Sequence, residues 1–187
     1  VNAGSLRIEY TSATGSVFPL RGAVAVKAGE MIDASVMSAA ALAAFIDAQI
    51  EDAKAKGVLF SLHLKATMMK VSDPIIFGSA VSRFYAPVLE KHPRTMAEIG
   101  FDPNNGIGDL YAKLGQLPDA QRAGIEADIA ALYAQRPALA MVNSDKGITN
   151  LHVPSDVIVD AAMPAMIRDS GGMWNAEGKL QDAKAVI

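Results

Sequence analysis

Hydrophobic positions along the chain change their spacing several times, and each change marks an expected element. Residues 6–10 and 17–20 place β-branched and aromatic side chains between glycines, which predicts a hairpin or edge strands. From Ser38 onward, apolar residues recur once per helical turn as far as Gly57, which stands where a C-terminal cap belongs. We therefore expect a short β segment followed by an amphipathic helix.

The next segment, residues 58–64, is almost continuously apolar and has the length of a strand. Such a run is typical of a strand that helices cover on both faces. Beyond it, Ser72 or Asp73 could cap a new helix with Pro74 in its first position, because proline has no amide hydrogen to lose there. This pattern predicts a helix over 74–91.

Two further helical patterns, 107–117 and 118–135, follow a polar stretch at 102–106, and a short buried strand is expected at 139–142. Helices that alternate with buried strands are typical of α/β proteins. The sequence therefore predicts a parallel or mixed sheet flanked by helices, with a helical insertion over 101–136.

Composition and charge limit the classes of partner. The 187 residues are 51% hydrophobic and 20% charged, which suits one compact domain or two small lobes. A net charge of -3 without any block of Lys or Arg gives no reason to expect nucleic acid or a membrane surface as a partner. The longest apolar run, 39–46, is far below the ~20 residues that cross a bilayer. With no cysteine in the sequence, a cytoplasmic protein is expected.

Both ends of the sequence resemble cut points. It begins at Val1 rather than Met, and it stops within the apolar run 183–187. Natural termini usually fray into polar residues. We interpret the chain as a fragment, and an isolated fragment is expected to expose surfaces through which it could self-associate.

Lys65 is the first candidate for chemistry because it follows the expected buried strand. In open α/β sheets, ligands collect beyond the carboxyl ends of strands. A lysine that is partly removed from water and close to a cation can serve as a base or proton relay. The alternative is a solvated lysine after a strand, and pattern alone favours that alternative.

Asp160 is the second candidate. Asp156 and Asp160 would share one face if 154–162 is helical, an arrangement that Mg²⁺ or Mn²⁺ accepts. Asp156 also fits a helix N-terminus. Asp160 lies in the apolar run 157–162 and needs a partner there, for which a metal, an arginine and a helix cap all remain open.

Other motifs give weaker signals. Gly106-Ile107-Gly108 begins like a dinucleotide fingerprint, but Tyr111 occupies the third glycine position, so we reject that interpretation. The polar residues 102–105 do not have the spacing of a calcium loop, and a turn with a helix cap is preferred. The three histidines lack zinc-site spacing and are interpreted as packed or surface side chains.

Long stretches of the chain carry a family resemblance. The segment HLKATMMKVSDP at 63–74 and the ungapped block MVNSDKGITNLHVPSDVIVDA at 141–161 resemble the monomeric isocitrate dehydrogenase family. Residues 29–37, 104–112 and 156–170 resemble it too. The similarity covers nearly all of the chain from about Val24 onward, and residues 1–23 match less closely.

The resemblance implies an enzyme that oxidises isocitrate with NADP and releases carbon dioxide to give 2-oxoglutarate, using Mg²⁺ or Mn²⁺. It places the catalytic lysine of the family on Lys65 and one of its metal-binding aspartates on Asp160. Residues 1–187 would then form part of the large α/β domain of a monomeric parent enzyme.

The remaining site residues of the family, including those that bind NADP, would lie outside this stretch, so the chain alone is expected to be inactive. The alternative hypothesis is a stand-alone, non-catalytic α/β module that binds a carboxylate or a divalent cation.

Overall fold

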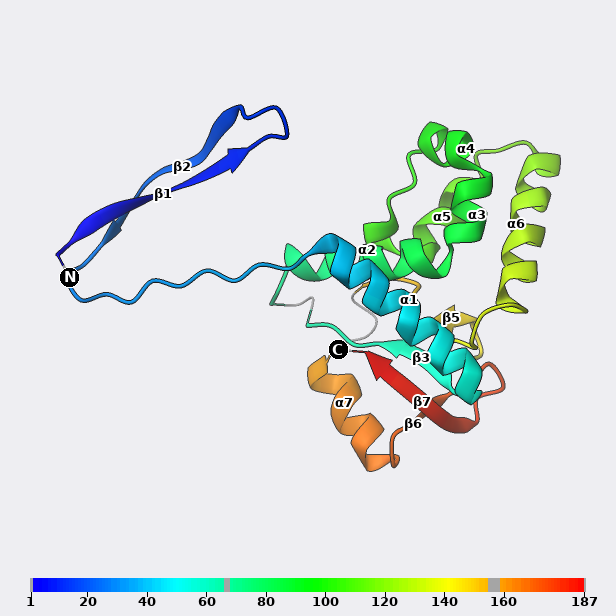
Figure 1. Ribbon diagram of the computed structural model, residues 1–187. Helices are drawn as coiled ribbons and strands as arrows, with labels where there is room; N and C mark the ends of the chain where they lie inside the picture. Colours follow the sequence, from blue (N-terminus) through cyan, green and yellow to red (C-terminus); the bar gives the residue numbers. More distant parts are fainter. Residues whose placement is uncertain (1, 66–67, 155–158, 187) are drawn as a thin grey trace. The chain divides into compact units, whose positions relative to one another are not determined.

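The computed structural model describes residues 2–65, 68–154 and 159–186, with side chains in the last range described from Met163 onward. Its helices and strands are labelled in Figure 1. The chain divides into two compact units, residues 1–37 and 38–187. Each unit is described by itself.

The first unit contains the expected hairpin. Strand β1 (Gly4–Thr11) pairs antiparallel with β2 (Val17–Val26), and the register is irregular around Ile8. The second strand continues well past the predicted range of 17–20. Within this unit both strands leave apolar side chains exposed, and the rings of Tyr10 and Phe18 stack across the pair at 6.1 Å.

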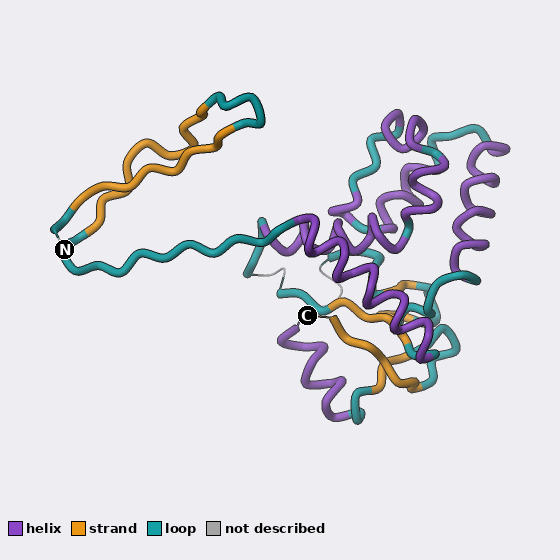
Figure 2. Tube along the Cα trace, in the orientation of Figure 1, coloured by secondary structure: helices purple, strands orange, loops and turns teal. Residues whose placement is uncertain are grey.

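The second unit contains a mixed sheet, as predicted. Figure 2 draws its strands in orange. Its strand order is β3-β7-β6, formed by β3 (Leu59–Leu62), β7 (Leu180–Val186) and β6 (Gly172–Trp174). The central strand β7 is parallel to β3 and antiparallel to β6. Strand β3 is buried along its whole length, which confirms the strand expected after the first helix.

A small second sheet lies near the other edge of β3. Strands β4 (Met141–Asn143) and β5 (Ile148–Thr149) pair antiparallel. Leu139, just before β4, forms an isolated parallel bridge with Phe60. The strand predicted at 139–142 is therefore split between an isolated bridge at Leu139 and strand β4 from Met141 onward, because the chain turns away from β3 after Ala140.

The described helices are distributed along the rest of the second unit. They are α1 (Ala39–Lys56), α2 (Ser72–Phe84), α3 (Ala86–Lys91), α4 (Pro93–Glu98), the 3-10 helix η1 (Pro103–Asn105), α5 (Ile107–Leu114), α6 (Asp119–Tyr133) and α7 (Val159–Arg168). Among them, none combines the length and apolar character that crossing a lipid bilayer requires.

Helix α1 shows both expected ends. The side chain of Ser38 accepts a hydrogen bond from the Ala41 amide at 3.2 Å. Gly57 adopts a left-handed conformation with φ 66° and donates its amide to carbonyls of the last turn. Glycine suits this position because a side chain would strain the left-handed backbone. The start of the helical pattern at Ser38 and the C-terminal cap at Gly57 were thus correctly predicted, whereas the capping bond of the Ser38 side chain is a finding of the structure.

The prediction of one helix over residues 74–91 was wrong in two respects. The helix begins earlier, at Ser72, so Pro74 is its third residue. It also breaks at Tyr85, because Pro87 has no amide hydrogen to donate to the Arg83 carbonyl one turn earlier. Arg136 fills this gap: its guanidinium donates to the carbonyls of Arg83 and Phe84 at 3.2 and 3.1 Å.

The mixed sheet is covered on both faces. Leu59 packs in a cluster with Met166 of α7 and Met173 of β6. Phe60 points to the opposite face and belongs to the main core, which contains buried side chains from α1, α2, α5 and α6. Successive residues of a strand point to opposite faces, so a continuous apolar run needs cover on both. The structure confirms this expectation.

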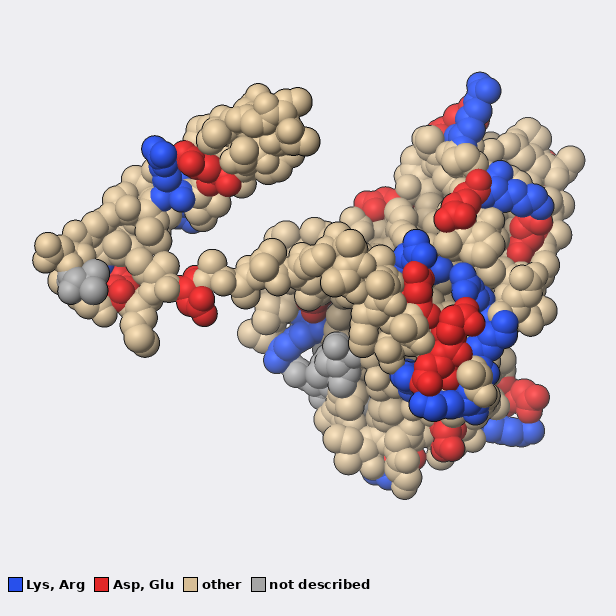
Figure 3. All heavy atoms as spheres, viewed as in Figure 1, with Lys and Arg blue, Asp and Glu red and all other residues tan. Residues whose placement is uncertain are grey.

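The surface of the second unit carries paired charges. Figure 3 shows acidic and basic side chains interleaved over the face that includes α1. Asp47 pairs with Arg83 at 2.6 Å, and Asp52 contacts both Lys56 and Lys184. The bonds from the two lysines lower the pKa of Asp52. Pairs this exposed stabilise a protein only modestly.

Candidate active site at the end of strand β3

Lys65 lies three residues beyond β3 and is half-buried. Its amide donates to the Asp73 carboxylate at 2.8 Å, and its carbonyl accepts from the amides of Met68 and Met69. Asp73 is only 7% exposed and also accepts from the Ser72 hydroxyl. The main chain of Lys65 is therefore held on both sides at the carboxyl end of a strand, the place that the sequence predicted.

The Asp73 side chain does not have the role that the sequence predicted for it. The sequence predicted Asp73 or Ser72 as the cap of helix α2, but the N-cap position is Val71, which makes no side-chain cap bond. The Asp73 carboxylate instead reaches back eight residues to Lys65. A buried carboxylate needs hydrogen-bond donors, and the bend between β3 and α2 supplies them.

Three fully buried polar side chains are linked by hydrogen bonds at β3, the strand that leads to Lys65. Asn150 donates to the Ser61 hydroxyl at 3.1 Å, and that hydroxyl bonds to Nε2 of His63 at 2.8 Å. Burial lowers the pKa of His63, which keeps its ring neutral near pH 7. The sequence left His63 as either a packed or a surface side chain, and it is packed; the sequence did not single out Asn150. The signal in the sequence that could have indicated its burial was the position of this amide side chain between the apolar residues Ile148 and Leu151.

Asp160 is the second residue of α7. This helix is described from Val159 to Arg168 and contains Pro164, and residues 155–158 of the expected range 154–162 lie outside the described residues. The side chain of Asp160 and all of Asp156 lie outside the described residues. Within the described residues, no three His, Asp or Glu side chains gather as a set that could hold a metal ion.

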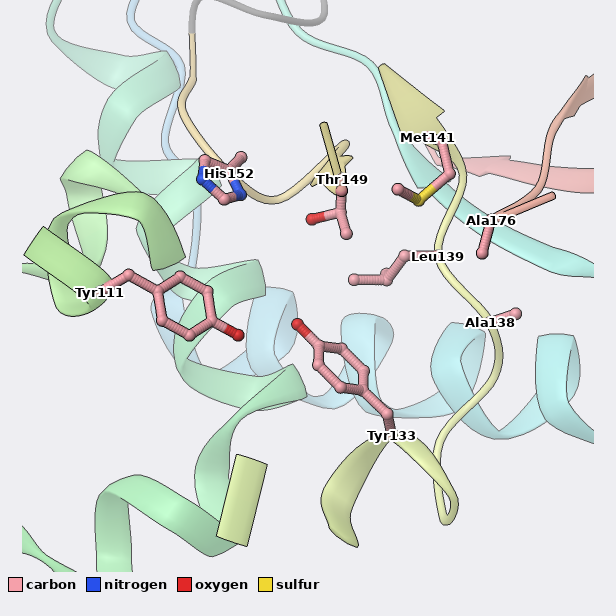
Figure 4. Close-up of a pocket in the computed structure, with 9 residues that line it drawn as sticks. Tyr111, Tyr133, Ala138, Leu139, Met141, Thr149, His152 and Ala176 are labelled. Carbon is pink, nitrogen blue, oxygen red and sulfur yellow. The ribbon is translucent and has the colours of Figure 1, made fainter. Parts of the chain in front are cut away.

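A separate cavity of about 330 Å³ lies between α5, α6 and the β4–β5 sheet (Figure 4). Tyr111 and Tyr133 direct their hydroxyls toward each other at its edge, and the ring of Tyr111 stacks on His152 at 6.1 Å. Thr149 Oγ1 and His152 Nδ1 are buried without a hydrogen-bond partner among the described residues. Lys65 is not among the residues that line this cavity.

The described lining of the cavity contains no Lys, Arg, Asp or Glu side chain. Burial raises the pKa of Tyr111, so its hydroxyl stays protonated. Tyr133 also bonds to the hydroxyl of Tyr85 at 2.7 Å. The sequence did not predict this cavity, because its walls come from segments that lie far apart in the chain.

This geometry defines a mixed α/β protein in which a lysine with a firmly held backbone follows a buried strand. The family model for monomeric isocitrate dehydrogenase matches residues 1–187. The chain is 66% identical over 184 residues to the isocitrate dehydrogenase [NADP] of Azotobacter vinelandii and 56% identical over 185 residues to isocitrate dehydrogenase [NADP] 2 of Colwellia maris. The chain belongs to the monomeric isocitrate dehydrogenase family.

The alignments cover most of this chain but little of each relative. They span 98% and 99% of the chain for these two proteins, and 99% of it aligns with 25% of the Colwellia protein. Isocitrate dehydrogenase [NADP] 2 of Mycobacterium tuberculosis is 49% identical over 98% of the chain. The chain thus spans about a quarter of the length of these curated relatives.

Proposed function

We propose that this chain is part of an NADP-dependent isocitrate dehydrogenase that converts isocitrate to 2-oxoglutarate and carbon dioxide. The observation that carries the proposal is the family match over residues 1–187, together with relatives named for this activity. The chain would contribute part of the large α/β domain, with residues 101–136 as a helical insertion. The parent would act as a monomer in the cytoplasm.

Lys65 would act on the hydroxyl of the substrate. Oxidation of a secondary alcohol removes a hydride from carbon and a proton from oxygen, and the nicotinamide accepts only the hydride. Lys65 would assist the loss of the C2 hydroxyl proton. Its location beyond β3 and its anchored backbone support this role, because a proton relay must be held within hydrogen-bond reach of the proton it moves.

Asp160 would hold a divalent cation. Carboxylate oxygens are the ligands that Mg²⁺ and Mn²⁺ prefer, and these cations take six or so oxygen ligands in all. Asp160 would therefore supply one part of a larger set. When bound, the cation stabilises negative charge that develops on the substrate oxygens.

The full-length protein that contains this chain is expected to form NADPH from NADP when isocitrate and Mn²⁺ are present. NADPH fluorescence measures the reaction, and 2-oxoglutarate is quantified in parallel. The 187-residue chain alone is expected to form none, since its relatives are about four times as long. A folded full-length protein that produces neither NADPH nor 2-oxoglutarate would refute the proposal.

The variant Asp160→Asn tests the metal role. In the full-length enzyme it is expected to raise the Mn²⁺ concentration for half-maximal activity by about 10–100-fold or more, because removal of a ligand should cost at least as much as removal of its outer-shell support. A Mn²⁺ titration of activity provides the measurement. Asp145→Asn, at an exposed turn position, serves as the control and should leave the titration unchanged. An unaltered titration for Asp160→Asn would remove Asp160 from the site.

A further inference from the structure

Strand β3 pairs with β7 on one edge and with residues 138–140 on the other, but the second pairing ends before β3 does. On that edge, Phe60 donates to the Ala138 carbonyl at 2.8 Å, and the Ala140 amide donates back to the Phe60 carbonyl at 2.9 Å. In a parallel ladder, the next rung would join the Leu62 amide to the Ala140 carbonyl. After Ala140, however, the chain turns into β4 to pair with β5. The backbone groups of Leu62 are left without a strand partner on this edge.

The side chain of Asn150 takes the place of that missing rung. Its Oδ1 accepts from the Leu62 amide at 3.0 Å, and its Nδ2 donates to the Leu62 carbonyl at 2.7 Å. Its own amide donates to the Ala140 carbonyl at 2.9 Å. Asn150 therefore sits where the two strands separate and bonds to both of them. The side chain is fully buried, so no solvent competes for these bonds.

The amide group of Asn150 can make this contact in one orientation only. A flipped amide would set its NH₂ group against the Leu62 amide and its oxygen against the Leu62 carbonyl, which are two repulsive contacts. The second hydrogen of Nδ2 goes to the Ser61 hydroxyl, which also bonds to His63. The bonds to Leu62 and Ser61 thus determine the rotamer of Asn150.

Further hydrogen bonds hold the backbone between Leu62 and Lys65. The His63 amide donates to the Val186 carbonyl of β7 at 2.8 Å, and the Lys65 amide donates to the Asp73 carboxylate. Asn150 is the anchor on the edge of β3 that faces away from β7. Within the part of the chain that the structure describes, Asn150 is what holds the Leu62 backbone on this edge, so its loss would leave the path from β3 to Lys65 less defined.

We propose that Asn150, supported by Ser61 and His63, is a positioning residue that determines where Lys65 stands in the active site. This inference rests on the proposed role of Lys65. Asn150 touches no substrate atom in this scheme and acts only through the backbone of β3. An error of about 1 Å in the placement of a reacting group can reduce the rate by about 10²-fold, so the expected effect lies in kcat.

The variant Asn150→Ala in the full-length enzyme is expected to lower kcat by roughly 10–100-fold. The control is Asn143→Ala, which removes an asparagine side chain that accepts from the Lys146 amide in an exposed turn of the same hairpin. Asn143→Ala should keep kcat within about twofold, as surface changes have small effects. Equal losses of kcat in both variants would overturn the proposal.

A double-mutant cycle separates positioning from a general structural role. In a Lys65→Met background, Asn150→Ala should change kcat by less than about twofold, because no ammonium group is left to misplace. If Asn150→Ala costs the same factor with and without Lys65, Asn150 does not act through Lys65 and the proposal fails. If Lys65→Met alone retains full activity, the proposed function of Lys65 has failed first, and the single variant shows this directly.

A milder variant covers the case in which Asn150→Ala does not fold. Ser61→Ala removes one bond of the Asn150 amide and the partner of His63 but keeps both bonds to Leu62. It is expected to lower kcat by roughly threefold to tenfold, in proportion to the weaker constraint on the amide. This loss should also disappear in the Lys65→Met background. An unchanged kcat for a folded Ser61→Ala enzyme would contradict the proposed network.

Discussion

Replacement of Lys65 by methionine in the full-length enzyme is expected to lower kcat for isocitrate oxidation by about 10²–10⁴-fold, the usual contribution of a positioned proton-transfer group. Methionine keeps a long unbranched side chain but has no proton to exchange. The backbone contacts of Lys65 with Asp73, Met68 and Met69 involve no side-chain atom of residue 65, so the bend after β3 should persist. Steady-state NADPH formation at saturating isocitrate, NADP and Mn²⁺ measures kcat.

Lys70→Met is the matched control for this experiment. Lys70 lies five residues away in the same connection and is exposed. The same change of residue type there is expected to leave kcat within about twofold, since exposed side chains away from a site contribute little. If Lys65→Met retained activity comparable to Lys70→Met, Lys65 could not be the proton relay.

The variant Gly106→Ala is expected to destabilise the junction between α5 and residues 151–152 by more than about 3 kcal/mol. Gly106 has φ 85° and ψ 176°, a conformation that is nearly restricted to glycine. A Cβ atom there would lie 2.0 Å from the carbonyl oxygen of His152. The two amides that follow Gly106 donate to the carbonyls of Leu151 and His152, so the backbone cannot move aside without loss of these bonds.

Amide hydrogen exchange in α5 measures this local effect better than global melting, because a long protein need not unfold as one unit. Exchange of α5 amides in Gly106→Ala should be accelerated by more than about 100-fold. Gly124→Ala is the control: Gly124 lies inside α6, where an added Cβ atom would meet no described neighbour within 4 Å, so alanine should leave exchange in α6 unchanged or slow it. Unaltered α5 exchange in Gly106→Ala would show that the junction tolerates a side chain.

Local sequence signals predicted the elements whose causes are local. Helix α1 was recognised from its apolar spacing, with Gly57 as its C-terminal cap, and these interactions lie within a few residues of one another. Strand β3 was recognised because a strand covered on both faces must be apolar at every position. The turn at 102–106 was also correct, since the Asp102 side chain accepts from the Asn104 amide two residues later.

Errors and omissions fall where the cause is distant in the chain. The break at Tyr85 depends on Pro87, which was visible in the sequence, but Arg136 satisfies the freed carbonyls from about 50 residues away. The central strand β7 was missed because its pairing with β3 joins residues more than 120 positions apart. Helix α5 ends at Leu114 rather than at the predicted residue 117.

For the candidate site, the sequence by itself determined that Lys65 follows a buried strand, and the family resemblance of the blocks around Lys65 and Asp160 assigned their proposed roles. Tertiary structure alone decided what holds Lys65 in place. Asp73, Val186 and Asn150 reach the end of β3 from three different segments, and Asn150 is 88 positions from Leu62. Spacing in a sequence reports which residues share a face of one element, whereas a hydrogen bond between distant segments exists only once the chain has folded.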